Sequence, residues 1–213
     1  MRVLVTLAIT LTIIFSGCSY KKPKNQWQID AAKASGDSVD RLLKGDKRVA
    51  TTSYNLAKSR AKASHNLTTL AAVELSWCAS NFILSHESYS CSRYEKLMEL
   101  VESHELQAYH DFLLQKIEPN KIEYLDREYR ALSRALLDDD IARAKSLMDQ
   151  IKKDSSYFIA AKLLKSHLSH ESIENILNRA SYGGYRGVVE FWLEFRDTKS
   201  DRETLEIIRG DKL

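Results

Sequence analysis

Apolar residues recur at every third or fourth position along most of the chain after Trp27, and this spacing constrains the fold more than any other feature. Such a period places apolar side chains on one stripe of an α-helix, whereas a half-buried strand alternates them. Only two prolines and seven glycines interrupt 213 residues, and the good helix formers Ala, Leu, Lys and Glu are abundant. The sequence therefore predicts an all-α fold.

The predicted helices are short and are separated by turns. They are expected over 27–43, from Asp46, from Asn66, and over 94–101, 106–117, 122–137, 141–151, 157–168, 173–180, 185–193 and 200–210. Ser200 to Glu203 has the pattern of a capping box, in which a hydroxyl and a carboxylate satisfy free backbone donors at a helix start. Short amphipathic helices must stack as antiparallel hairpins to bury their apolar faces. We expect one helical domain over 26–213, either a short α-solenoid or a compact helical array.

One segment near the C-terminus has the look of a repeat. Ala180, Gly184, the pair Val188-Val189 and the pair Trp192-Leu193 are spaced as in the core of an ankyrin repeat, which this segment resembles. A glycine turn followed by an apolar stripe is also typical of Sel1-like and tetratricopeptide hairpins. No second copy lies nearby. The resemblance implies helical hairpins of repeat type and no named repeat.

The N-terminus reads as an export signal. Arg2 precedes an apolar run from Val3 to Phe15, and small residues follow before Cys18. A membrane-spanning helix is the alternative, but 13 apolar residues rise only about 20 Å as a helix, against a hydrocarbon core of roughly 30 Å. Phe15-Ser16-Gly17-Cys18 resembles the lipobox of bacterial lipoproteins, with Phe15 in the place where that family prefers leucine.

The lipobox resemblance implies a processing scheme and a location. Residues 1–17 would be a cleaved signal peptide, Cys18 would carry fatty chains such as palmitate, and residues 18–25 would be a lipidated tether. Ser19 follows the cysteine, whereas Asp at that place retains many lipoproteins at the inner membrane. The resemblance therefore implies lipid anchoring in the outer membrane, on the periplasmic face. The whole chain resembles small helical lipoproteins of Gram-negative bacteria, which implies no function.

Two further cysteines, Cys78 and Cys91, flank a predicted helix end and a polar loop. In an oxidising periplasm a disulfide between them would join neighbouring helices, and we favour this pairing. The alternatives are two free buried thiols or half of a metal site. Neither a CxxC pair nor a helical i,i+4 histidine pair accompanies them, so the sequence predicts no metal site.

The charge balance argues against a nucleic-acid partner. Without residues 1–17 the chain has 31 basic and 29 acidic side chains, and a nucleic-acid binder needs a large clustered basic surplus. Lys21, Lys22 and Lys24 lie beside the predicted lipid. They either contact anionic head groups or form a solvated tether.

No catalytic signature is found. His104-Glu105 begins like a zinc-protease motif, but the next histidine is His110, and that motif needs a spacing of four. His167 and His170 lie on either side of a predicted helix break. Glu87-Ser88 resembles the catalytic pair of lytic transglycosylases, yet the Gly-Leu-Met-Gln segment of that family is missing. We predict no catalytic residue and no cofactor.

Aromatic residues are dense near the C-terminus, and Tyr182, Tyr185 and Phe191 are the candidates for partner contact. Tyr182 falls at a turn and Phe191 falls off the apolar stripe, and aromatic side chains exposed on a hairpin surface favour contact with a partner. We favour a helix that is buried on two sides, which would place most of these rings in the core. Together these features favour a non-enzymatic, membrane-anchored protein that binds or helps to assemble another envelope protein. The alternatives are a cell-wall or lipid-modifying enzyme with an unrecognised site, and a carrier of a small ligand in a deep apolar cavity.

Overall fold

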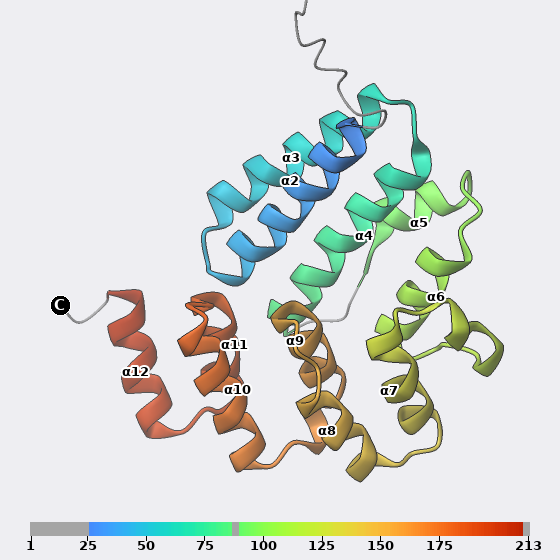
Figure 1. Cartoon of the computed structure of the whole chain (residues 1–213). Helices are drawn as coiled ribbons and strands as arrows, with labels where there is room; N and C mark the ends of the chain where they lie inside the picture. The colour runs from blue at the N-terminus through green and yellow to red at the C-terminus, as the bar shows by residue number, and fades with distance from the viewer. Residues whose placement is uncertain (1–25, 87–89, 211–213) are drawn as a thin grey trace, which may run out of the picture.

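A computed structural model describes residues 26–86 and 90–210. The predicted signal peptide 1–17, the lipobox with Cys18 and the tether 18–25 lie outside the described residues, as does the pair Glu87-Ser88. Within the described residues the chain forms helices and no strand, so the all-α prediction is confirmed (Figure 1).

The helices shorten after the third. They are α2 (Gln26–Leu43), α3 (Lys47–Ala63), α4 (Leu67–Leu84), α5 (Ser92–Met98), α6 (His104–Leu113), the 3-10 helix η1 (Pro119–Tyr124), α7 (Arg127–Leu137), α8 (Ile141–Asp149), α9 (Asp154–Leu163), the 3-10 turn η2 (Lys165–His167), α10 (His170–Tyr182), α11 (Arg186–Arg196) and α12 (Lys199–Arg209).

Helix α4 is the centre of the array. It contacts α2 and α3 on one side and α5, α6, α9 and α11 elsewhere (Figure 1). By length and composition alone it is apolar enough to cross a bilayer, and here it is packed among other helices. One contiguous apolar core extends from Leu43 to Leu205 and encloses Phe112, Phe158 and Trp192. Burial of each such side chain contributes about 1.5–3 kcal/mol, which explains why the array holds together.

Three helix pairs are joined by the same kind of turn. In each turn one residue adopts a positive φ. The backbone amide of the residue that follows it donates to the carbonyl of the residue five positions before that amide, as in a Schellman cap. The left-handed residues are Gly45 (φ 85°), Asp139 (φ 54°) and Gly184 (φ 70°), in the α2–α3, α7–α8 and α10–α11 turns. Gly and Asp tolerate this conformation better than most residues, so the local sequence selects the turn.

The array closes on itself near its C-terminal end. The first turn of α11 lies against the end of α2, where Gly187 lets the backbones approach. A Cβ at Gly187 would lie 3.0 Å from the carbonyl oxygen of Leu43 and 3.2 Å from that of Leu42. Because α2 and α11 pack directly, the described chain forms a compact helical array, which is one of the two predicted arrangements.

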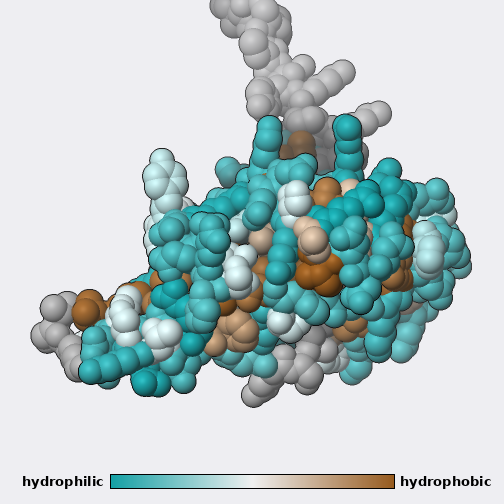
Figure 2. Space-filling view, turned by 90° about the horizontal axis from the view of Figure 1, so that it is seen from below, coloured by the Kyte–Doolittle hydropathy of each residue, from teal (hydrophilic) through white to brown (hydrophobic). Residues whose placement is uncertain are grey.

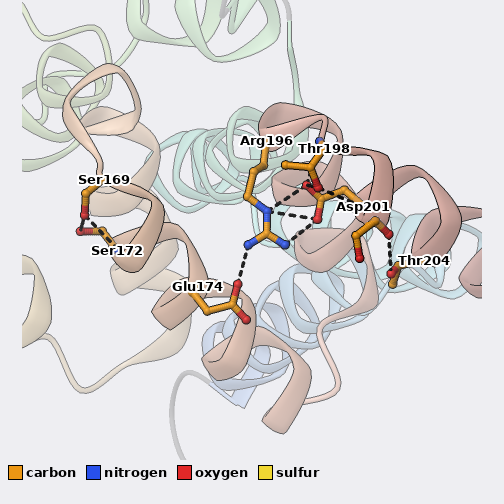
Figure 3. A network of polar contacts seen from close by, with 8 residues as sticks. Ser169, Ser172, Glu174, Arg196, Thr198, Asp201 and Thr204 are labelled. Atoms are coloured by element: carbon orange, nitrogen blue, oxygen red, sulfur yellow. Dashed lines mark hydrogen bonds and ion pairs between the residues drawn. The ribbon is translucent and has the colours of Figure 1, made fainter.

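The last helix, α12, is fixed by a polar network (Figure 3). The Arg196 Nε donates to both carboxylate oxygens of Asp201, at 2.9 and 3.1 Å, and the guanidinium also pairs with Glu174. Asp201 accepts from the Thr198 amide at 3.0 Å and from its hydroxyl at 2.6 Å. The capping box is therefore Thr198 with Asp201, and the prediction of Ser200 with Glu203 was wrong. The shared arginine explains the choice, because it holds the Asp201 carboxylate at the helix start.

Other helix boundaries also differ from the prediction; for example, the helix expected over 157–168 ends at Leu163 and is followed by the 3-10 turn η2. The expected helix over 122–137 is divided, because Pro119 begins a 3-10 helix and Leu125 is extended and buried before α7 starts. Helix α6 ends at Leu113, where Gln115 turns with φ 55°, and does not reach 117. The predicted start at Asn66 is confirmed, since its side chain accepts from the Thr69 amide at 2.8 Å.

Candidate functional site: a groove beside the central helix

A groove of 540 Å³ lies between α2, α4 and the start of α9. Most of its lining side chains are small or apolar, and Tyr185 stands at one end. The lining residues are Ala32, Ser35, Gly36, Val39, Asp40, Leu43, Thr69, Ala72, Val73, Ser76, Ala79, Ser80, Ile83, Tyr109, Lys153, Asp154, Ser155, Ile159 and Tyr185.

Small side chains keep the groove open. On α2 the lining positions Ala32, Ser35 and Gly36 share one helix face, and on α4 the positions Ala72 and Ser76 do the same. At Gly36 a Cβ would have no atom within 4 Å, so this wall has free space in front of it. From Ala32 to Leu43 the wall is about 16 Å long at 1.5 Å per residue. The groove is thus long enough for about three turns of another helix.

At the Tyr185 end of the groove both carboxylates of the lining are held in ion pairs. Asp154 pairs with Arg179 at 2.8 Å, and Asp40 pairs with Lys44 at 2.9 Å. Burial, together with a hydrogen bond from its hydroxyl to Asp154, raises the pKa of Tyr185 to about 12. Both carboxylates are thus occupied by cations, and the Tyr185 hydroxyl is held by Asp154. The arrangement suits binding of an apolar group more than acid–base chemistry.

The structure separates the three aromatic candidates. Tyr185 lines the groove, and Tyr182 at the end of α10 is 97% exposed. Phe191 is only 2% exposed, so its ring is not accessible to a partner in this structure. Its ring lies 4.6 Å from that of His86, and the Lys162 ammonium lies 4.1 Å from its centre. Helix α11 is covered by α2 and α4 as well as by α10 and α12, which is the two-sided burial that the sequence favoured.

The structure joins Cys78 and Cys91 in a disulfide with Cα atoms 5.8 Å apart. This is the pairing that the sequence favoured. The bond connects α4 to the residue before α5 and borders a hollow of 330 Å³ that Glu74, Trp77 and Arg93 also line. It therefore fixes the short α5 to the central helix.

The histidines considered for catalysis do not converge. His86 pairs with Glu194 at 2.8 Å, whereas the His104 ring stacks on Tyr124 with centroids 5.0 Å apart. His110 is buried against the Tyr94 ring, and burial lowers its pKa. Among the described residues no group of three or more His, Cys, Asp or Glu side chains is arranged to hold a metal ion. No catalytic assembly is formed by these side chains in the part of the chain that the structure describes.

Two charged groups in unusual surroundings were missed by the sequence interpretation, the buried Glu74 and the half-buried Lys162. Glu74 is 5% exposed in α4, accepts from the Tyr54 hydroxyl at 2.6 Å and pairs with Lys58 at 3.0 Å. Lys162 donates to the Ser85 carbonyl, and burial lowers its pKa to about 8. Glu74 could have been found in the sequence, because it is a carboxylate inside the apolar run of α4. The burial of Lys162 could not, because it depends on contact with α11.

A second hollow, of 280 Å³, lies at the α7–α8 turn and is lined by Phe112, Ser133, Leu136 and His167, among others. The buried Ser133 hydroxyl makes no hydrogen bond within residues 26–86 and 90–210. Apolar side chains are visible in the middle of the face that is lowest in Figure 1, between hydrophilic ones (Figure 2). This hollow is smaller than the groove and its wall is less regular.

No family model, curated protein or solved structure matches this chain. The groove and the lipobox pattern are therefore the two features on which a function can be argued.

Proposed function

We propose that this chain is a lipoprotein of a bacterial outer membrane, anchored through Cys18 on the periplasmic side, and that its helical array is a non-enzymatic binding module for another envelope protein. The Phe15-Ser16-Gly17-Cys18 pattern supports the anchor. The observation that carries the binding role is the groove, whose two walls present small side chains at helical spacing.

The proposed occupant of the groove is an amphipathic helix of the partner. Small residues at positions 32, 35 and 36 and at 72 and 76 allow a helix backbone to approach closely, and the open space receives its bulky apolar side chains. Lys153 is exposed at the rim and pairs with no carboxylate among the described residues. An acidic residue flanking the apolar stripe of the partner helix would complement this lysine.

Filling the groove tests this proposal. Gly36→Leu adds a side chain where no atom lies within 4 Å, so it should block the groove without disturbing the fold. Gly36→Ala is the matched control, because it removes the same helix-interior glycine and adds one methyl group. After crosslinking in membranes and affinity capture, we expect a partner with the wild type and Gly36→Ala, and its loss with Gly36→Leu. Equal recovery with both variants would exclude the groove, and the absence of any partner would exclude the binding role.

The anchor is tested separately. Growth with a clickable palmitate should label the wild-type chain and leave a Cys18→Ala variant unlabelled. An unlabelled wild-type chain would refute the anchor while leaving the groove experiment valid.

The apolar character of the groove also supports a second candidate function, carriage of a small apolar ligand. Its 540 Å³ lies within the range of sites for drug-sized molecules. Native mass spectrometry of protein purified from membranes would distinguish this function, because a carried lipid-like molecule would add a discrete mass that Gly36→Leu abolishes.

A further inference from the structure

One end of the α2–α3 hairpin is basic. From Lys47 to Val73 the sequence contains no Asp or Glu. Arg60 and Lys62, in the last turn of α3, are exposed, and neither pairs with a carboxylate within residues 26–86 and 90–210. Lys58, one turn earlier, is occupied by Glu74 at 3.0 Å. Two unneutralised cations thus lie at this end of the helix.

Exposed apolar side chains accompany these cations. Ile29, in the first turn of α2, is 54% exposed, and Leu67, the first residue of α4, is 42% exposed. Because α2 and α3 are antiparallel, the start of α2 lies beside the end of α3, at the upper end of the molecule (Figure 1). We call Ile29, Arg60, Lys62, His65 and Leu67 the basic end. Basic and apolar side chains intermixed in this way are typical of protein surfaces that lie in the head-group layer of a membrane.

Opposing charge at this end is slight. Asp30 is the one carboxylate in the first two turns of α2, it is half-buried, and it accepts from the Gln26 amide at 2.9 Å. His65, between α3 and α4, is exposed and adds positive charge only when protonated. The basic end therefore keeps its positive charge at neutral pH through Arg60 and Lys62.

With the proposed anchor at Cys18, the tether keeps the basic end within reach of the membrane. Seven residues separate Cys18 from Gln26, so even a fully extended tether reaches only about 28 Å. Electrostatic attraction to a bilayer falls off within about 8–10 Å, so this tether alone allows the domain either to lie on the surface or to stand away from it. The charge of the basic end decides between these two states.

We propose that the basic end docks on anionic lipid head groups and holds the array against the bilayer. This inference relies on the proposed Cys18 anchor for its orientation, but the lipid-binding surface belongs to the folded domain. The groove begins at Ala32 on α2 and Thr69 on α4, and it extends from there along both helices toward Leu43 and Ile83.

Vesicle binding by the unlipidated mature chain tests the docking. Residues 18–213 contain the whole described core, so this chain, with Cys18→Ser, can be studied without its lipid. The variant Arg60→Gln with Lys62→Gln removes two charges from the basic end. The variant Lys47→Gln with Arg48→Gln removes two exposed charges from the opposite end of the same helix and is the matched control. Sedimentation with phosphatidylcholine vesicles, with and without phosphatidylglycerol, at about 0.15 M salt measures binding.

We expect binding to the vesicles that contain phosphatidylglycerol and little binding to phosphatidylcholine alone. The double variant at the basic end should bind about 30-fold more weakly, and the control should stay within about 2-fold of the wild type. An equal loss of vesicle binding for both variants would show attraction by the overall charge of the protein. No loss of binding for either variant would assign the binding to the lysines of the tether. Both outcomes overturn the proposal. Circular dichroism of each variant verifies the fold. Because this chain carries no lipid, failure of palmitate labelling would refute the anchor and not this surface.

Discussion

Replacing Asp201 by asparagine should destabilise the protein strongly, because this carboxylate holds α12 to the array. The residue is 1% exposed and is shared between Arg196 and the cap at Thr198. Removing one partner of a buried ion pair costs about 3–5 kcal/mol. Arg196 keeps Glu174, and asparagine still offers one oxygen to the Thr198 amide, so we expect the lower limit, about 3 kcal/mol.

Thermal unfolding followed by circular dichroism measures this loss. In a domain of this size about 1 kcal/mol moves Tm by roughly 2–4 °C, so Asp201→Asn should lower Tm by about 6–12 °C. Asp197→Asn is the matched control, with the same chemical change four residues earlier. Asp197 pairs with Arg202 at 3.0 Å, but their side chains are 65% and 60% exposed, and such pairs contribute about 0–1 kcal/mol.

The pH dependence gives a second measure of the same interaction. Arg196 above all, and the hydrogen bonds of Thr198, hold the pKa of Asp201 well below its usual range. A carboxyl group whose pKa is depressed in the folded state stabilises the protein above its unfolded pKa of about 3.9 and loses this contribution as the pH falls further. The difference in stability between wild type and Asp201→Asn should therefore be constant at about pH 5 to 7, because the carboxyl group is ionised there in both the folded and the unfolded state. The difference should shrink in stronger acid. Equal Tm values for the Asp201 and Asp197 variants at pH 7 would refute the reasoning.

Four further changes test the packing, each by denaturant unfolding. Gly187→Ala should cost about 1–3 kcal/mol, because the added methyl group meets backbone oxygen at 3.0 Å. Replacing Cys78 and Cys91 together by serine should cost about 3 kcal/mol relative to the wild type, since the disulfide joins residues 13 positions apart. A difference from the wild type that appears only when both proteins are treated with reductant before measurement would contradict this. Lys162→Met should stabilise the protein at pH 7, because burial lowers the lysine pKa to about 8; the gain should fade as the pH rises toward about 10, where the unfolded lysine also becomes neutral. Ser133→Ala should be neutral or slightly stabilising, as no bond of the hydroxyl is lost among the described residues, and a cost above about 1 kcal/mol would reveal a missing partner.

Most of the helices could be predicted from local sequence, because their causes are local. The period of apolar residues marks each stripe, and Asn66 begins α4 by accepting from an amide three residues later. The position of the last capping box was missed because two overlapping patterns, Thr198 to Asp201 and Ser200 to Glu203, compete within six residues. Asp201 serves Arg196 as well as the backbone, and Arg196 lies on the preceding helix. The lipobox and the location that it implies stay predictions.

The candidate site was less accessible to sequence reasoning. Tyr185 was singled out for its place beside an apolar stripe, and it does line the groove. Phe191 lies off the apolar stripe of its own helix, and it is buried because side chains from distant parts of the chain, His86 and Lys162, lie against its ring. The run of small residues in α2, from Ala31 to Ser38, was the signal for the groove. Its meaning depends on which helices stand opposite, and spacing within one helix does not give that.

The contact between Gly187 and the end of α2 has a consequence for how the polypeptide matures. Leu43 and Gly187 are in contact although they lie more than 140 positions apart in the sequence. The α2–α3 hairpin therefore cannot pack against α11 until nearly the whole chain has been synthesised. Pairings of such long range slow the search for the native state. The closed array is therefore expected to form late, after the helices from α2 to α10 already exist.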